Sequence, residues 1–533
     1  MNRPKFYIYL PIVFALVLIL GIFIGSTFGL KKSNGSISLD SGDQYNKIDQ
    51  ILRYVEDQYV DTIKTKDLVE KTIISLLANL DPHSSYISAE ELLTSNEPLQ
   101  GNFEGIGVEF NIVDDTIRVI SAIAAGPSEA VGVQAGDKII KVNGKVVAGK
   151  KITNKQVMEN LKGKGGTKVK VSIMRRGKAG LLDFNITRGT IPIYSIDVSY
   201  MLNSKTGYIK ISRFGATTYD EYMLAFEKLK LQGMQQLVVD LRGNGGGYLN
   251  TAVDIADEFL SNGKGIVYTA GKARPRKDYT ATKKGEFENG KLVVLIDDGS
   301  ASASEILAGA LQDNDRATII GRRSFGKGLV QEQSEFSDSS AIRLTIARYY
   351  TPTGRCIQKS YANGVDAYYE EEMNRFANGE LGNADSIKIN DSIKFTTPAG
   401  KVVYGGGGIV PDVFVALDTV GRTLYLSELV YSGVLNDFAF EYSDKERNKL
   451  KAFKSVDNFN KSFSISPTLF NELVVYADKN KIKRNQTEIK MSESIIKNQL
   501  KALIARNIFN GEGYYQVIQS QDNVLKKAVE LMK

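Results

Sequence analysis

The chain has 533 residues, 42% of them hydrophobic and 24% charged, which is typical of globular proteins but too long for a single core. Its net charge of +7 is spread over many lysines without a long basic run, which argues against nucleic-acid binding. With one histidine, His83, and one cysteine, Cys356, an internal disulfide is impossible and a Cys/His zinc site or Cys–His dyad nearly so. We expect several domains, no metal and no cofactor.

The N-terminal segment predicts a membrane anchor. Residues 6–30 carry no charge, and about 25 residues are enough to cross a bilayer core of roughly 30 Å. Signal peptides have shorter apolar regions, so a single-pass anchor within residues 1–32 is favoured over cleavage after Gly29. Arg3 and Lys5 place the short end in the cytoplasm, although two lysines follow the span. The rest of the chain would then be extracytoplasmic, on the periplasmic side of the inner membrane.

Residues 33–100 read as a linker followed by an N-terminal helical region. Apolar spacing predicts a helix from about Tyr45 and a second one over "TKDLVEKTIISLLANL". A serine cap opens a third helix at "SAEELL". Between the last two lies "LDPHSSYIS", a polar turn in which we interpret His83 as structural.

Residues 101–190 predict a small separate module. "GIGVEFNIVDDTIRVISAI" indicates two strands around an Asp-Asp turn, and "TKVKVSIMRRGKAGLLDFNITRG" indicates a hairpin. "TNKQVMENLKG" is an amphipathic helix that Thr153 would cap. The pattern is that of a helix beside an antiparallel sheet.

Residues 191–423 alternate strand and helix, which predicts βαβ units on a largely parallel sheet. A polar insertion at 357–408 interrupts this pattern, and we expect it to be a surface excursion. Residues 424–533 predict a charged helical region in which no chemistry is visible. Active sites of such sheets gather beyond the carboxyl ends of the strands, so the loops there are the candidates.

One of these loops is "GSASASE", where a strand hands over to a helix. Taken alone, Ser300, Ser302 and Ser304 are most simply helix caps. A helix start also presents free N–H groups and the positive end of the helix dipole, however, and both suit an oxyanion. A serine here is therefore a candidate nucleophile.

The loop "GRRSFGKG" supplies a candidate base. It nearly matches a phosphate-binding loop, but Gly328 replaces the hydroxyl residue and "LVQEQSEF" then continues as a strand, which excludes that reading. Lys327 is a surface lysine on the simplest view. If it were buried, its pKa would fall and it could replace histidine in a Ser–Lys dyad.

A third loop, "GNGGG" at 243–247, can present backbone N–H groups or simply form a tight turn. Serine, lysine and a glycine loop at the strand ends of one sheet together indicate acyl transfer. Asp313 lies 11 residues beyond Ser302 on one helix, about three turns away, so it cannot orient a base there. We expect Asp313 to be structural.

"GSASASEILAGALQDNDRATIIGRRSFGKGLVQ" closely resembles the C-terminal processing peptidases, serine proteases with a Ser–Lys dyad. "LDPHSSYIS", "FEGIGVEF", "DLRGNGGG", "RYYTPTGR" and "GIVPDV" match in order, so the resemblance spans about 45–420. It implies a multidomain α/β protein with a protease core of the crotonase and Clp type. Matched residue by residue, it implies Ser302 as nucleophile, Lys327 as general base, Gln331 as the group orienting the lysine, and an oxyanion hole from Ala303 with Gly246 or Gly247.

The same resemblance identifies 101–190 as a PDZ domain. Its peptide-binding loop would be the "GIGV" stretch, Gly105, Ile106, Gly107 and Val108, which would hold the terminal carboxylate of an extended protein tail. The expected partners are therefore protein substrates with exposed C-termini, the membrane, and a second copy or an adaptor. The competing hypothesis is a membrane-tethered PDZ scaffold with an inactive protease core.

Overall fold

The computed structural model of the protein describes residues 15–20, 46–282 and 284–533. Contacts divide the chain into two units, residues 1–76 and 77–533. Apart from 15–20, which is helical, the predicted anchor lies outside the described residues. Among the helices that are described, none is both long and apolar enough to cross a bilayer.

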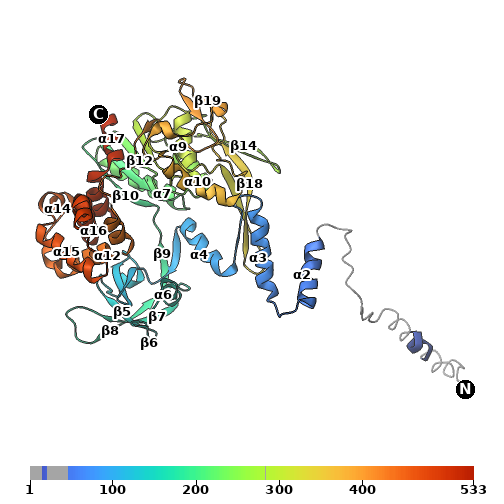
Figure 1. The fold of residues 1–533 in the computed structure, drawn as a ribbon, viewed down its shortest axis with the longest axis horizontal. Helices are drawn as coiled ribbons and strands as arrows, with labels where there is room; N and C mark the ends of the chain where they lie inside the picture. The colour runs from blue at the N-terminus through green and yellow to red at the C-terminus, as the bar shows by residue number, and fades with distance from the viewer. Residues whose placement is uncertain (1–14, 21–45, 283) are drawn as a thin grey trace, which may run out of the picture. The chain divides into compact units, whose positions relative to one another are not determined.

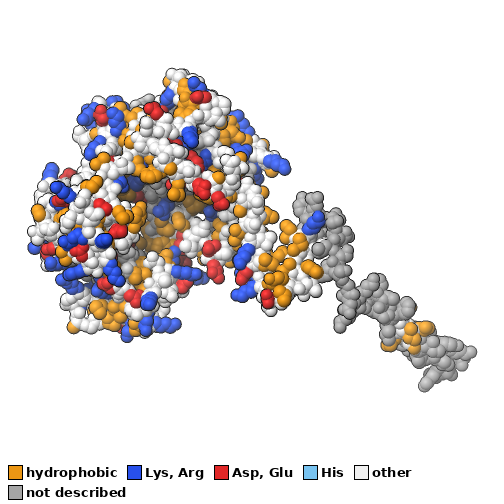
Figure 2. Space-filling model, in the orientation of Figure 1, with side chains coloured by type: hydrophobic (Ala, Val, Ile, Leu, Met, Phe, Trp, Pro, Cys, Tyr) orange, Lys and Arg blue, Asp and Glu red, His pale blue; other side chains and the backbone are white. Residues whose placement is uncertain are grey.

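The first unit contains α2 (Asn46–Gln58) and most of α3 (Thr65–Ala78), the two helices predicted there. Hydrophobic side chains of α2 are exposed and gather visibly on its surface in Figure 2. In the second unit, β1 (Ser85–Ile87) leads into α4 (Ala89–Gln100). Ser88 occupies the expected cap position of α4, but its hydroxyl donates to Glu91 and makes no cap bond to the backbone.

Residues 102–192 form the predicted antiparallel module (Figure 1). Its strands are β2 (Asn102–Gly105), β3 (Val108–Val113), β4 (Thr116–Ala122), β5 (Lys138–Val142), β6 (Lys145–Val146), β7 (Lys168–Met174), β8 (Leu181–Thr187) and β9 (Gly189–Pro192). The helices are α5 (Pro127–Ala130) and α6 (Asn154–Leu161), and Thr153 caps α6 as predicted. The sheet order β3-β4-β5-β7-β8 leaves β3 at an edge.

A six-stranded sheet of order β10-β11-β12-β15-β16-β21 forms the centre of the α/β region. All neighbours are parallel except β10 with β11, which confirms the largely parallel sheet. Its strands are β10 (Ile196–Met201), β11 (Thr206–Ile211), β12 (Gln236–Asp240), β15 (Lys291–Ile296), β16 (Thr318–Gly321) and β21 (Val413–Phe414). The crotonase and Clp assignment stays a prediction.

Alternate residues of each strand serve opposite faces of this sheet. Leu237 and Val239 pack with α7 (Thr218–Leu231), α8 (Leu249–Asp257) and α9 (Ala303–Asp313). Val238 faces the other side, where α17 (Asn523–Met532) covers the sheet with an apolar stripe. The final helix therefore belongs to the core of the α/β region.

A second sheet, of order β1-β18-β13-β14 with β17 beside β18, flanks the first. Its remaining strands are β13 (Gly265–Gly271), β14 (Arg274–Thr280), β17 (Leu329–Glu335) and β18 (Ala341–Tyr350). The insertion then contributes α10 (Val365–Ala377), two 3-10 turns (Ala384–Ser386 and Asp391–Ile393) and a hairpin of β19 (Lys394–Thr396) and β20 (Val402–Tyr404).

The C-terminal region is helical, as predicted, and has its own hydrophobic core. Its helices are α11 (Leu424–Tyr431), α12 (Val434–Lys445), α13 (Arg447–Leu450), α14 (Val456–Ser462), α15 (Pro467–Lys479) and α16 (Gln486–Ile518), with a 3-10 turn (Gln519–Gln521) before α17. α16 is kinked at Phe509 and Asn510, whose dihedral angles are not helical.

Candidate active site

Ser302 lies at the turn from β15 into α9 with strained backbone angles, φ 57° and ψ −114°. A non-glycine residue held in such a conformation costs about 1–3 kcal/mol, and residues of this kind cluster at functional sites. The backbone N–H of Ser302 donates to Oε2 of Glu305 at 2.8 Å, which helps to hold the turn. The serine is half-buried and lines a pocket of about 610 Å³.

The flanking serines point elsewhere and are fully buried. The Ser300 hydroxyl donates to the carbonyl of Leu241 at 2.9 Å, and that of Ser304 to the carbonyl of Asn244 at 2.8 Å. Both carbonyls belong to the segment after β12 that leads into the glycine loop. These two serines therefore fix the turn to that loop.

Lys327 lines the same pocket as Ser302, Gly246, Gly247 and Gln331. Its Nζ donates to Oε1 of Gln331 at 2.9 Å, and Nε2 of Gln331 in turn donates to the carbonyl of His83. Burial lowers the pKa of Lys327, and the positive charge of Arg343 lowers it further. Both effects make it easier for the amine to lose its proton than it is for a lysine in water, and the neutral amine is the form that can accept a proton.

The glycine loop approaches Ser302 so closely that side chains are excluded. A Cβ on Gly246, whose φ is 102°, would lie 2.7 Å from Cβ of Ser302 and 3.0 Å from the backbone N of Ala303. A Cβ on Gly247 would lie 2.1 Å from the carbonyl oxygen of Phe214. The N–H of Gly246 donates to Oδ1 of Asn244, whereas that of Gly247 has no hydrogen bond within the described residues.

Glu305 is a central residue of the site that the sequence did not reveal. Its buried carboxylate accepts from the N–H groups of Ser302, Gly326 and Lys327 at 2.8–2.9 Å and from the hydroxyl of Ser324 at 2.5 Å. Burial raises its pKa, and these hydrogen bonds oppose that rise. One carboxylate therefore holds together the turn around Ser302, called the serine turn below, and the loop at 321–328 that carries Lys327, called the lysine loop.

Tyr349 is a second link between the two loops. Its hydroxyl lies 3.1 Å from the carbonyl oxygen of Ser302 and 2.9 Å from that of Lys327. The ring is fully buried, and burial raises the pKa of the phenol well above its usual value. Tyr349 therefore stays protonated and can act only as a hydrogen-bond donor to these carbonyls.

His83 lies beside the lysine and contributes through its backbone. Its carbonyl holds Gln331, its N–H donates to Asp81 at 2.8 Å, and its Nε2 lies 2.9 Å from the Tyr368 hydroxyl. Burial, reinforced by the charge of Lys327, lowers the pKa of His83 to about 4. The imidazole is therefore neutral at physiological pH. It contacts Tyr368, while the backbone carbonyl of His83 holds Gln331.

Most residues of the insertion at 357–408 are exposed or half-buried, as predicted from its polarity, but several of its side chains are buried against the loop that carries Lys327. Tyr368 and Arg375 of α10 are buried, and the Arg375 guanidinium donates to the carbonyls of Ser324 at 2.8 Å and Phe325 at 3.1 Å. The few buried charged residues of the insertion pair with one another or with the loop at 321–328. The insertion thus supports the loop that carries Lys327.

Asp313 has the structural role expected for it. It forms an ion pair of 2.7 Å with Arg355, and both side chains are completely buried. Its other oxygen accepts from the N–H and hydroxyl of Thr353, at 3.1 and 2.7 Å. It therefore fixes the segment that follows β18.

The predicted peptide-binding loop lies at the start of the edge strand β3. Gly105, Ile106 and Gly107 are buried, Val108 is half-buried, and Gly107 has φ 71°. The carbonyl of Ile106 accepts from the N–H and hydroxyl of Ser128, and that of Gly107 from the N–H of Ile123. The N–H groups of Ile106 and Gly107 have no acceptor among the residues the structure describes. Such a loop beside a free strand edge can receive a carboxylate.

The lowered pKa of Lys327 predicts the pH dependence of its reactions. A reaction that needs the neutral amine gains rate as pH rises through that pKa, below the usual value of about 10.4. At a pH above the pKa of Lys327 in the folded protein, the unfolded chain binds more protons than the folded one. The stability that is lost by burying Lys327 is therefore recovered as pH rises. We expect Lys327→Met to have a higher melting temperature than the wild type at neutral pH. The difference between the two melting temperatures should become smaller as the pH approaches 10. Differential scanning fluorimetry measures both melting temperatures, and a difference that stays constant with pH would contradict the lowered pKa of Lys327.

Comparison with known proteins adds the family. Residues 205–369 match peptidase family S41, 105–186 a PDZ domain, and 425–510 a family of unknown function. A carboxy-terminal-processing protease of Bartonella bacilliformis is 37% identical over 332 residues, 60% of this chain and 75% of that protein. The carboxy-terminal processing protease CtpA of Bacillus subtilis is 33% identical over 371 residues, 68% of this chain and 78% of that protein.

Among solved structures, a photosystem II D1 C-terminal processing protease is 30% identical, with a TM-score of 0.33, over 58% of this chain and 83% of that chain. The sequence matches confirm the resemblance seen in the motifs and cover both the protease core and the PDZ module. The chain belongs to the carboxy-terminal processing proteases of peptidase family S41, with a PDZ domain and a helical C-terminal region.

Proposed function

We propose that the protein is a membrane-anchored serine endopeptidase that cleaves extracytoplasmic proteins near their C-termini. The observation that carries the proposal is that a strained serine, a half-buried lysine and three glycines of the loop at 243–247 line one pocket. The anchor is the apolar segment 6–30, which supports an extracytoplasmic location for the catalytic domains. The substrates are proteins with exposed, extended C-terminal tails.

In the proposed mechanism, neutral Lys327 takes the proton of the Ser302 hydroxyl as its oxygen attacks the scissile carbonyl. Gln331 accepts a hydrogen bond from Nζ and so orients the amine. The protonated lysine then gives its proton to the leaving amine, and an acyl-enzyme forms at Ser302. Water, deprotonated by Lys327, hydrolyses the acyl-enzyme and restores the serine.

The oxyanion is held in this proposal by the N–H groups of Ala303 and Gly247. Ala303 is the first residue of α9, so its N–H has no partner within the helix and lies at the positive end of the dipole. Gly246 was the other candidate, but its N–H already donates to Asn244 at 2.8 Å. The role of Gly246 is to let the loop lie close to Ser302, because a Cβ at this position would clash with the serine.

The PDZ domain selects the substrate in this proposal. The tail pairs with the free edge of β3, and its terminal carboxylate is held by N–H groups of the loop from Gly105 through Ile106 and Gly107 to Val108. Recognition by main-chain hydrogen bonds tolerates many tail sequences. A requirement for a free carboxylate follows from it.

A pair of peptides tests this function. The full-length protein in detergent is expected to cleave a peptide with a free C-terminal carboxylate, with kcat/KM at least about tenfold above that of the C-terminal amide, since one charged hydrogen-bonded group is lost. A fluorophosphonate probe is expected to label Ser302, as located by mass spectrometry. Binding of the free-acid peptide without cleavage or labelling would instead establish the inactive PDZ scaffold.

A further inference from the structure

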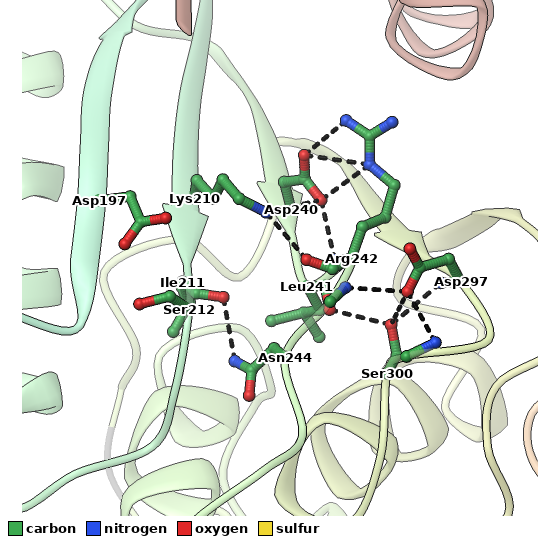
Figure 3. A network of polar contacts seen from close by, with 12 residues as sticks. Asp197, Lys210, Ile211, Ser212, Asp240, Leu241, Arg242, Asn244, Asp297 and Ser300 are labelled. Atoms are coloured by element: carbon green, nitrogen blue, oxygen red, sulfur yellow. Dashed lines mark hydrogen bonds and ion pairs between the residues drawn. The ribbon is translucent and has the colours of Figure 1, made fainter. Parts of the chain in front are cut away.

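The residue that precedes the glycine loop, Arg242, is held by carboxylates from two distant parts of the chain. Its Nε donates to Oδ1 of Asp240 at 3.0 Å, and its Nη2 to Oδ2 of Asp240 at 2.6 Å (Figure 3). On the other side, Nη1 and Nη2 donate to the two oxygens of Asp522 at 3.1 and 2.7 Å. This is a two-point contact with a carboxylate from the helical C-terminal region, and such forked pairs fix geometry as well as charge.

The loop that follows Arg242 is fixed at successive residues, as Figure 3 shows. The carbonyl of Arg242 accepts from Nζ of Lys210 at 2.9 Å, and the N–H of Gly243 donates to Asp297 at 2.8 Å. Asn244 donates from its amide to the carbonyl of Ile211 at 3.0 Å. A displacement of Arg242 is therefore passed on to the glycines that lie against Ser302.

Asp522 is itself well placed to hold its position. It caps α17 by accepting from the N–H of Leu525 at 3.0 Å, and α17 is packed on the central sheet. Nearby, the Tyr515 hydroxyl donates to Asp197 at 2.7 Å and so attaches the end of α16 to β10. The carboxylate thus projects from an element that is fixed to the protease core, although it lies beyond the residues that match peptidase family S41.

We propose that Asp522 is a positioning residue for the oxyanion loop, so that the helical C-terminal region completes the catalytic site. The inference rests on the proposed function, because that function has the glycine loop bind the oxyanion. Asp522 pairs Nη1 of Arg242, which has no hydrogen bond to Asp240, and shares Nη2 with Asp240. Without Asp522, Nη1 loses this acceptor and the guanidinium is held by Asp240 from one side, so the loop loses part of the support from which Gly247 is aimed.

The test replaces Asp522 by asparagine, which caps a helix as well as aspartate does but has no charge to pair with Arg242. We expect kcat of Asp522→Asn to fall about tenfold with KM changed less than twofold, and an unchanged melting temperature. The rate of fluorophosphonate labelling, which needs the same oxyanion site but no PDZ contact, should fall in parallel. Asn523→Ala is the matched control, since Asn523 begins the same helix but its side-chain amide donates to the exposed Asp418 rather than to Arg242.

A double-mutant cycle separates this role from a general one. If Asp522 acts through Arg242, then Asp522→Asn has no further effect on the labelling rate in an Arg242→Gln background. Wild-type values of kcat and labelling rate in Asp522→Asn would overturn the inference, as would a change in KM alone. A wild-type protein inert toward both peptide and probe would instead overturn the proposed function, and the inference with it.

Discussion

Ser302→Ala and Lys327→Met are each expected to lower kcat for cleavage of a free-acid peptide by at least about 10⁴-fold. The first substitution removes the attacking oxygen. The second removes the one lysine among the described residues that line the pocket with Ser302, and His83 does not replace it because its imidazole contacts Tyr368. Lys327→Arg should be equally inactive, since a guanidinium stays protonated.

The neighbouring serines provide the control for this prediction. Ser304→Ala loses one buried hydrogen bond to Asn244, worth about 1 kcal/mol, and is expected to retain activity within about tenfold of the wild type. Steady-state cleavage assays with active-site titration distinguish the two classes. If Ser302→Ala kept its activity and Ser304→Ala lost it, the assignment of the nucleophile to Ser302 would be wrong.

Glu305→Gln is expected to lower kcat/KM by about 100-fold although the reacting groups are intact. An amide offers one acceptor oxygen where the carboxylate offers two, so its NH₂ group must face at least one of the backbone donors from Ser302, Gly326 and Lys327. The serine turn and the lysine loop then separate, and a misplacement of about 1 Å costs roughly 10²-fold.

The same substitution is expected to lower stability, because a buried donor without an acceptor costs about 1–3 kcal/mol. Glu305→Ala leaves several such donors and should be the more severe variant. Glu332→Gln is the control, since the side chain of that glutamate is 50% exposed and forms its ion pair with the exposed Arg274. Kinetics and thermal melts of the three variants test the prediction, and wild-type kcat/KM in Glu305→Gln would refute it.

Much of the fold could be predicted because its signals are local. The alternation of apolar runs gave the parallel sheet, the Asp-Asp pair gave the turn between β3 and β4, and Thr153 gave the start of α6. Ser302, Lys327 and the glycine loop follow strand ends in sequence and come together in space for that reason. Motif spacing was therefore enough to predict that these residues lie together.

What could not be predicted depends on contacts between distant segments. Glu305 reads as an ordinary charged residue near a helix start, and only the fold buries it under Ser324 and Lys327. The insertion looked exposed because it is polar, yet Arg375 is buried with its charge directed at backbone carbonyls. Asp522 lies in a region with no visible chemistry, and its partner is 280 residues away.

The support that the insertion gives to the lysine loop has a consequence for biosynthesis. The carbonyls of Ser324 and Phe325 find their donors on Arg375, and the Ser324 hydroxyl accepts from the N–H of Ile409. Chains grow at about 5–20 residues per second, from the N-terminus. A nascent chain that has just emerged as far as Lys327 therefore carries the proposed nucleophile and base but not the residues that hold the loop of Lys327 in place. If Ser302 and Lys327 act as proposed, we expect a new chain to be inactive until the insertion has been synthesised, without any inhibitory segment.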